Sequence, residues 1–450
     1  MEITYAAGPD HPDTLWSRFQ HADFTGKAGD LAAARELLVV LIEDHVRVLG
    51  HDHTDTLWTR RRHAIHTGES GDWEAARDLL AVLVEDSTDF LGPENLHTHV
   101  ARHQHAFFTG KAGDAAAACD LFLSLIADQT HLLGADHRET QWSRHQHAFF
   151  TWRARGPAVA RDLFASLVED RTRVLGADHA DTLSARFRHA HLTGEAGDPD
   201  SARDLLAVLV EDRTDVLGPD DPETGKARDL LAYFVTKAGD HAAARDVFAS
   251  LVDAHTRVLG ADHRKTLTAR YQQAYYTAQA GDPAAARDLA ATLTDDSTRV
   301  LGADHPSSLQ ARYQWALYTG KSGDYAGARE LFGSLVDART RALGADHPTT
   351  LEARHLLAFY TGEAGEYAAA RDLFASLVED RTRVLGPDRA VTLSARSLHA
   401  HYTAKSGDRA AARDLASALL EDRTRVLGAD HPDTLRTRGM YADFGGRTGP

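Results

Sequence analysis

The sequence predicts an all-α fold: an α-solenoid, or superhelix, of antiparallel helix pairs that follow one another in tandem. Three observations support this prediction. Glycine recurs every 42 residues, a second glycine-marked turn lies 21 residues after all but one of these glycines, and the segments between the turns carry apolar residues at helical spacing. Ten 42-residue repeats plus one terminal helix are therefore expected. The repeats begin at Gly8, Gly50, Gly92, Gly134, Gly176, Gly218, Gly260, Gly302, Gly344, Gly386 and Gly428.

The spacing also predicts the domain organisation. Residues 1–7 are expected to form a short leader, and residues 8–450 a single solenoid domain. One helix pair cannot bury its own apolar face, whereas stacked neighbours share a continuous core. The repeat therefore overrides the several globular domains that the length alone suggests.

Each repeat is expected to contain a short helix A and a longer helix B, which in the first repeat lie at about 14–25 and 31–49. Asp30 stands where an N-cap is needed, and Gly50 where a left-handed C-cap is needed. Alanine is found at the position of Ala22 in every helix A and at that of Ala34 in every helix B. A small residue at a constant position predicts that two helices approach closely there.

The composition limits the class of partner. Hydrophobic residues make up 43% of the chain and charged residues 26%, so the chain can bury a core. The formal net charge of −16 argues against binding to nucleic acid or to an anionic membrane, and it allows a basic partner.

The single cysteine, Cys119, excludes an internal disulfide and a cysteine-based zinc site, and it favours a reducing compartment. The N-terminus lacks the basic start and apolar run of a signal peptide. No apolar stretch approaches the roughly 20 residues that span a bilayer. A cytoplasmic protein is therefore expected.

The repeat resembles the tetratricopeptide repeat, in the long form seen in kinesin light chains and in bacterial signalling proteins. The last copy reads Leu-Gly-Ala-Asp-His-Pro-Asp-Thr-Leu-Arg-Thr-Arg over 427–438. The alanine of helix A, the Gly-Asp turn and the alanine of helix B complete the match, which covers nearly the whole chain. The resemblance implies a superhelix whose concave face is lined by helices A and binds proteins or peptides.

The resemblance also implies which side chains face that groove, namely those at the positions of Trp16, Phe19 and Asp23 in each helix A. These positions vary between repeats, as expected of an asymmetric binding surface, and they are rich in residue types that dominate interfaces. The alternative is that these side chains pad the wall between neighbouring helices A. The candidate partner-binding residues are Trp16, Phe19, Trp58, Arg61, His103, Phe107, Trp142, His145, Phe149, Tyr271, Tyr275 and Tyr313.

The sequence departs from the family pattern in three places. The family often has an asparagine at the position of Phe19, where it helps to hold a peptide backbone or carboxylate, and no repeat has one here. A carboxylate clamp is therefore in doubt. In the fourth repeat, residues 151–157 replace the usual inter-helix turn, and in the sixth Gly225 replaces a leucine that most repeats carry. We expect these two repeats to be the least stable.

Arginine stands four residues before the constant alanine of every helix A, which predicts an inward position. A buried guanidinium must be paired, and helix B offers acids at the positions of Glu36 and Glu43. A structural ion pair is predicted, with an anion-binding ladder as the alternative. The row consists of Arg18, Arg60, Arg102, Arg144, Arg186, Arg228, Arg270, Arg312, Arg354, Arg396 and Arg438.

Histidine suggests a metal site or a pH sensor. Pairs such as Asp10–His11 recur at the turns, however, so turn formation and capping are predicted for them. A second row lies on helix A of the first five repeats, and we interpret it as hydrogen-bonded side chains packed between helices. No metal and no cofactor are predicted. The second row consists of His21, His63, His105, His147 and His189.

No catalytic function is predicted. Gly320-Lys321-Ser322 resembles the end of a phosphate-binding loop, but Trp315 stands where that loop needs a glycine. We therefore predict a protein- or peptide-binding scaffold. One alternative is a structural or self-assembling element whose uncapped ends join head to tail. Another is the sensor module of a larger signalling system.

Overall fold

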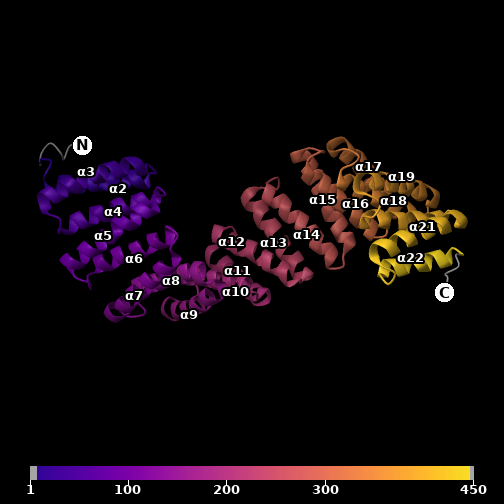
Figure 1. Cartoon of the computed structure of the whole chain (residues 1–450). Helices are drawn as coiled ribbons and strands as arrows, with labels where there is room; N and C mark the ends of the chain where they lie inside the picture. Colours follow the sequence, from indigo (N-terminus) through magenta and orange to yellow (C-terminus); the bar gives the residue numbers. More distant parts are fainter. Residues whose placement is uncertain (1–7, 446–450) are drawn as a thin grey trace. The chain divides into compact units, whose positions relative to one another are not determined.

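The computed structural model describes residues 8–445, and all 21 regular elements in this part of the chain are α-helices (Figure 1). The predicted all-α solenoid of helix pairs is confirmed. The first helices of the pairs, called A helices below, are α2 (Pro12–Lys27), α4 (Thr54–Glu69), α6 (Leu96–Lys111), α8 (Arg138–Arg155), α10 (Ala180–Glu195), α12 (Pro222–Ala238), α14 (Arg264–Gln279), α16 (Pro306–Lys321), α18 (Pro348–Glu363), α20 (Ala390–Lys405) and α22 (Pro432–Asp443). The second helices, called B helices, are α3 (Leu31–Leu49), α5 (Trp73–Leu91), α7 (Ala115–Leu133), α9 (Pro157–Leu175), α11 (Pro199–Leu217), α13 (His241–Leu259), α15 (Pro283–Leu301), α17 (Tyr325–Leu343), α19 (Tyr367–Leu385) and α21 (Arg409–Leu427).

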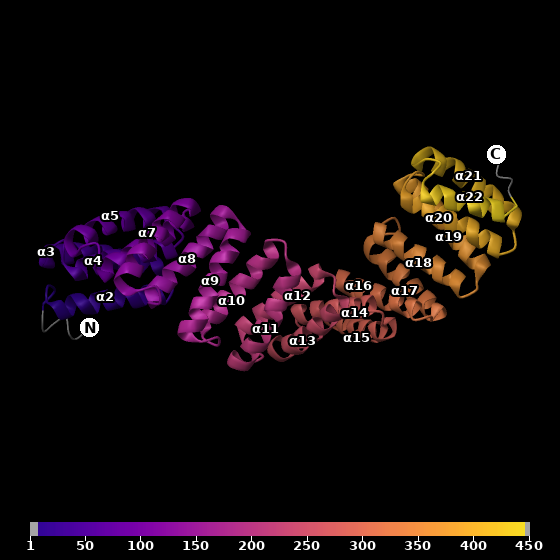
Figure 2. The same ribbon diagram turned by 90° about the horizontal axis from the view of Figure 1, so that it is seen from below.

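The chain divides into two compact units, residues 1–218 and 219–450. In the first unit, each helix from α2 to α11 packs against the next helix along the chain, and in the second unit the same holds from α12 to α22 (Figure 2). The single domain predicted over 8–450 stays a prediction, and the predicted leader at 1–7 lies outside the described residues. Among the described helices, none combines the length and apolar character needed to cross a membrane.

Histidine is the N-cap residue of most of the A helices. The ring Nδ1 of His11 accepts a hydrogen bond from the backbone N–H of Asp13 at 3.3 Å, and Pro12 occupies the first turn, where its missing N–H has no cost. The capping role predicted for the Asp-His pairs is confirmed. Because the cap lies at His11, α2 covers Pro12–Lys27, and the predicted range of 14–25 is too short at both ends.

The B helices begin as predicted but end differently. The Asp30 carboxylate accepts a hydrogen bond from the backbone N–H of Ala33 at 3.1 Å, so the predicted N-cap is confirmed. Gly50 has φ 100° and ψ 166°, and the predicted left-handed helical cap is wrong. This positive φ still favours glycine. The extended ψ carries the chain away from α3 toward His53, which caps the next helix.

Contacts between small residues and rings join consecutive A helices. Ala22 and Ala34 are fully buried, as their constant positions predicted. Phe108 of α6 lies on Gly68 of α4 so closely that a Cβ atom on this glycine would be 2.0 Å from the ring. Tyr402 of α20 lies on Gly362 of α18 in the same way.

In the contact between the fourth and fifth repeats, the large and the small side chain have changed places. Trp152 of α8 stands where most repeats have the glycine, and Leu192 of α10 stands where other repeats have the ring. Trp152 packs against the core cluster that contains Leu192. The large side chain has therefore moved to the other helix, while the contact between the helices is kept.

Five buried arginines of the B helices donate hydrogen bonds to backbone oxygens of A helices. The Arg381 guanidinium of α19 donates a hydrogen bond to the backbone oxygen of Val391 in α20 at 2.8 Å and another to that of Leu351 in α18 at 3.2 Å. Each of these arginines exposes only 2–6% of its surface. They are Arg171, Arg213, Arg339, Arg381 and Arg423.

A ring of the preceding A helix covers several of these guanidinium groups. The Tyr313 ring centre lies 5.1 Å from the Arg339 guanidinium, and the Phe187 ring centre lies at the same distance from that of Arg213. A ring face next to a cation is an attractive arrangement. Arg339 thus combines a hydrogen bond to the backbone oxygen of Thr349 with a contact to an aromatic ring.

We predict that Arg381→Met lowers stability, whereas Arg383→Met does not. The first change removes charge-assisted hydrogen bonds in a buried place, which typically contribute about 1.5–3 kcal/mol. Arg383 lies two residues further along α19, about half a turn around the helix, and its side chain is 58% exposed. Urea-induced unfolding followed by circular dichroism measures both. Equal unfolding midpoints for the two variants would contradict the linking role of Arg381.

Candidate functional site

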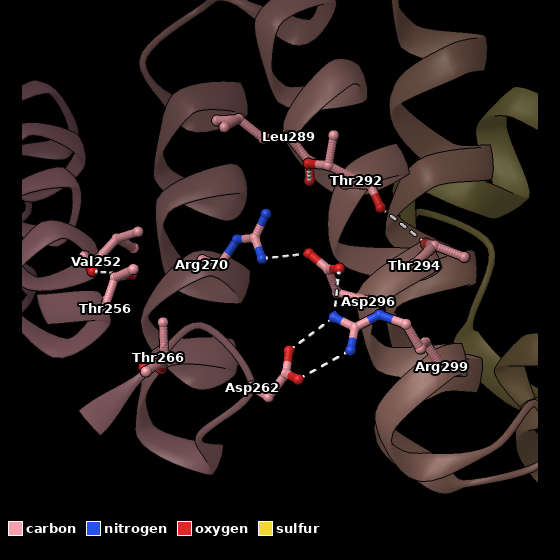
Figure 3. A network of polar contacts seen from close by, with 12 residues as sticks. Val252, Thr256, Asp262, Thr266, Arg270, Leu289, Thr292, Thr294, Asp296 and Arg299 are labelled. Carbon is pink, nitrogen blue, oxygen red and sulfur yellow. Dashed lines mark hydrogen bonds and ion pairs between the residues drawn. The ribbon is translucent and has the colours of Figure 1, made fainter.

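A chain of four alternating charges ties the two helices of a repeat to the turn before them. In the seventh repeat, Arg299 binds Asp262 through two hydrogen bonds of 2.8 and 2.7 Å and also binds Asp296 at 3.0 Å (Figure 3). Asp296 is bound in turn by Arg270 of α14 at 2.5 Å. The hydrogen bond from Arg299 holds the pKa of Asp262 below its ordinary value.

The row of arginines predicted to be structural enters this network with a different partner. Arg18 lies 2.8 Å from Asp44, not from the predicted Glu36 or Glu43, which are exposed. Arg18 is also only partly buried, so the predicted inward position is wrong, because its long side chain reaches the rim of α3. Eight members of the row pair with an aspartate at this position: Arg18, Arg60, Arg102, Arg144, Arg186, Arg270, Arg354 and Arg396.

The other three members of the row lack this aspartate. Ala254 and Ala338 replace it in the sixth and eighth repeats. There Arg228 donates to the backbone oxygen of Pro219, and Arg312 donates to the Ser334 hydroxyl. Arg438 lies on α22, which no described B helix follows.

In the first compact unit, predicted groove residues form a continuous aromatic row across three A helices. Trp16 stacks on Phe19 with ring centres 5.5 Å apart, and Phe19 lies 5.9 Å from Trp58. The Trp58 indole N–H donates to Nδ1 of His97 at 3.3 Å. Trp16 is 49% exposed, whereas Phe19 is buried in the core. Arg61 lies over the Trp58 ring at 5.3 Å.

A second row lies on α6 and α8. Trp142 of α8 lies between His103 of α6, at 6.2 Å, and His145, at 5.9 Å. His103, Phe107 and Trp142 line a cavity of about 520 Å³ together with Ile65. Trp142 is 44% exposed, so it is accessible to a partner. We call this cavity, bounded by α4, α6 and α8, the aromatic groove.

The remaining candidates lie next to other parts of the same helices. Phe149 contacts Phe150 and Trp152, and Arg188 lies 5.9 Å from its ring centre. In the second unit, the Tyr271 hydroxyl accepts a hydrogen bond from Gln310 and the Tyr313 hydroxyl donates one to Glu352. Tyr275 is exposed beside Tyr276. Tyr271, Tyr275 and Tyr313 do not share one cavity with the aromatic groove.

The sequence reasoning missed several residues of the aromatic groove. Trp73 comes from the start of α5, a B helix, and Gln104, Lys111 and Gln146 form the polar part of the lining. Only helix A was searched for groove residues. The signal that could have found Trp73 is that it is the only tryptophan on a B helix.

Four members of the second histidine row are buried or half-buried, as expected, whereas His21 is exposed, and within residues 8–445 only His147 of this row makes a side-chain hydrogen bond. His147 Nε2 lies 3.4 Å from the Thr151 hydroxyl. Burial lowers the pKa values of His63, His105, His147 and His189. Within residues 8–445, no group of three or more His, Cys, Asp or Glu side chains is arranged to hold a metal ion.

The comparisons with known proteins agree with this geometry. The family description "Tetratricopeptide repeat" matches residues 307–383 and 392–433. The chain contains tetratricopeptide repeats. Each matched segment lies in the second compact unit and contains the helix pairs described above. None of the curated proteins matches the sequence.

Several solved structures are distantly similar to this tetratricopeptide repeat chain. One is a putative kinesin light chain of Podosopora anserina with nearly identical TPR-like repeats, at 19% identity, covering 46% of this chain and 98% of that chain with a TM-score of 0.38. The apo form of RapI is 9% identical over 82% of this chain and 98% of that chain, with a TM-score of 0.46. A signal transduction ATPase of Pyrococcus horikoshii with a tetratricopeptide repeat sensor is 8% identical over 91% of this chain and 55% of that chain, with a TM-score of 0.45.

We predict that stability falls as the pH is lowered from about 6.5 to about 4, and that His355→Phe makes the fall shallower. Burial lowers the pKa of His355 to about 4, whereas in an unfolded chain it is about 6.5. Between these values the unfolded chain binds more protons than the folded chain, so acid favours unfolding. His103 and His145, whose pKa values are also lowered to about 4, keep part of the dependence in the variant.

Urea unfolding at several pH values measures this effect. Phenylalanine fits the place of His355, since Phe187 covers Arg213 at the corresponding point. His131→Gln, at an exposed position, serves as the control and should keep the dependence of the parent. An unchanged pH dependence in His355→Phe would refute the contribution of this ring.

Proposed function

We propose that the protein is a non-catalytic cytoplasmic scaffold that binds a polypeptide segment in the aromatic groove of its first compact unit. Tetratricopeptide repeats in general serve as binding scaffolds, and this supports the class of function. The observation that carries the proposal for this chain is the accessible Trp142, which stacks between His103 and His145 in a cavity of about 520 Å³.

The lining of the groove suits a peptide better than a small polar molecule. Phe107, Trp142 and Ile65 offer apolar surface, and Gln104 and Gln146 offer hydrogen-bonding groups to a peptide backbone. Buried aromatic anchors surrounded by polar groups are typical of the energetic centres of interfaces. The rings are already stacked on one another, so binding needs little ordering of side chains.

The charged groups at the groove do not strongly favour a partner of either positive or negative charge. Lys111 lies over the Phe107 ring at 5.6 Å, and Glu69 lies close to His66, with 2.8 Å between the nearest atoms. Lys111 and Glu69 both line the aromatic groove. The preference in this groove is therefore expected to come from apolar side chains of the partner.

We predict that replacing Phe107 and Trp142 by alanine weakens peptide binding by about thirtyfold or more, as expected for the loss of a hot spot of about 2 kcal/mol. Peptides of twelve residues are selected from a random displayed library on the full chain, and their affinities are measured by fluorescence anisotropy. Leu123→Ala is the control, since Leu123 is an exposed apolar residue on the B helix α7. Peptides that bind parent and double variant equally would refute the groove.

A further inference from the structure

The position of the buried arginines is occupied by other residues in half of the repeats. In the fourth, fifth and eighth to tenth repeats an arginine stands there and donates hydrogen bonds to backbone oxygens of A helices, as described above. The other repeats carry a smaller or differently shaped polar side chain at this position. These side chains are His45, Ser87, Gln129, His255 and Ser297.

In the seventh repeat, the change to serine leaves a deep cavity between α14, α15 and α16. Ser297 is 2% exposed and lies in the wall of a cavity of about 800 Å³. The corresponding cavity of the fourth repeat measures about 530 Å³, and there Arg171 is part of the lining. The cavity of the seventh repeat also reaches Tyr271 and Leu293, which lie deeper in the repeat.

The lining of this cavity contains the groups that hold a guanidinium elsewhere in the chain. Leu267 and Ser307 stand at the positions of Leu351 and Val391, whose backbone oxygens accept the hydrogen bonds of Arg381. Tyr271 stands at the position of Tyr313, whose ring covers Arg339. Two carbonyl groups and one ring are therefore placed as in a guanidinium site, whereas the seventh repeat supplies no guanidinium from α15.

In the second repeat, another arginine lies next to this place. Ser87 stands there at the arginine position, and Arg61 of α4 lines the same region next to the Trp58 ring. Only about 10 Å³ of open space is left. In the second repeat, the serine at this position is thus accompanied by a guanidinium from another helix. In the seventh repeat, Tyr271 stands at the position of Arg61.

We infer that the cavity of the seventh repeat binds an arginine side chain of a partner polypeptide, which supplies the missing guanidinium. This inference rests on the proposed function in treating the partner as a polypeptide, but it assigns a separate contact in the second compact unit. The net charge of −16 attracts a basic segment. Asp262 and Arg264 lie at the mouth, and Asp262 is already bound by Arg299. Arg264 repels a lone cation, whereas a peptide can place an acidic residue beside it.

The test uses two peptides that differ only in charge, acetyl-Glu-Arg-Gly-amide and its citrulline counterpart, titrated into the full chain by calorimetry. The arginine peptide is expected to bind about tenfold more tightly or better, because charge-assisted hydrogen bonds are lost with citrulline. Ser297→Arg is expected to abolish this binding and to raise the urea midpoint, since its own guanidinium fills the site. Ser297→Ala should bind as the parent does.

A second variant keeps the test independent of how Ser297→Arg folds. Arg339→Ser opens the corresponding site beneath Tyr313, and the loss of stability should be reversed by millimolar ethylguanidinium but not by ethylurea, its neutral counterpart. Equal binding of the two peptides by the parent, or unchanged binding by a folded Ser297→Arg, would overturn the inference. Peptides selected on the aromatic groove should bind Ser297→Arg normally, which separates this outcome from a failure of the proposed function.

Discussion

In the five repeats that carry it, the buried guanidinium of the B helix is the contact on which cohesion with the neighbouring helices depends most directly. Its charge is removed from water, which is costly unless it is fully hydrogen-bonded. Carbonyl groups of the A helices supply part of those bonds, as Leu351 and Val391 do for Arg381, whose Nε has no hydrogen-bond partner among the described residues. A repeat therefore needs the next repeat to complete the environment of its own arginine. Where Ser297 replaces the arginine, the same position becomes accessible space.

The sequence predicts the architecture well because the signals for it are repeated. The period, the N-cap at Asp30 and the alanines Ala22 and Ala34 recur with little change, and the structure confirms them. It does not show which row of arginines is buried, because the Arg18 position carries arginine in every repeat although Arg18 is only partly buried, whereas the position of the buried Arg381 carries arginine in half of the repeats. Asp44 and Glu43 differ by one residue, which turns the side chain by about 100° around the helix. That rotation decides which of them meets Arg18.

The residues of the candidate site are harder to predict from the sequence than the architecture is, for a related reason. Positions on one stripe of helix A differ in burial, since Phe19 is in the core whereas Trp16 is exposed. The distinction depends on the residues of the neighbouring helices, such as Trp58 and Leu38, and not on spacing within one helix. Trp73 enters the aromatic groove from a B helix. Prediction of the groove therefore needed the packing of three helices, which the period alone does not contain.

Trp152 and Leu192 reverse the usual placement of the small residue and the ring, and this limits how the array of repeats can evolve. Unequal recombination can add or delete a 42-residue copy without disturbing the reading frame or the phase of the helices. A duplicated fourth copy, however, would bring Phe150 of the new copy against Trp152 of the old one, where only a leucine now fits. Its deletion would set Leu192 over Gly110, which is shaped for a ring. The fourth and fifth copies are therefore matched to each other and are inherited as a pair, not as interchangeable modules.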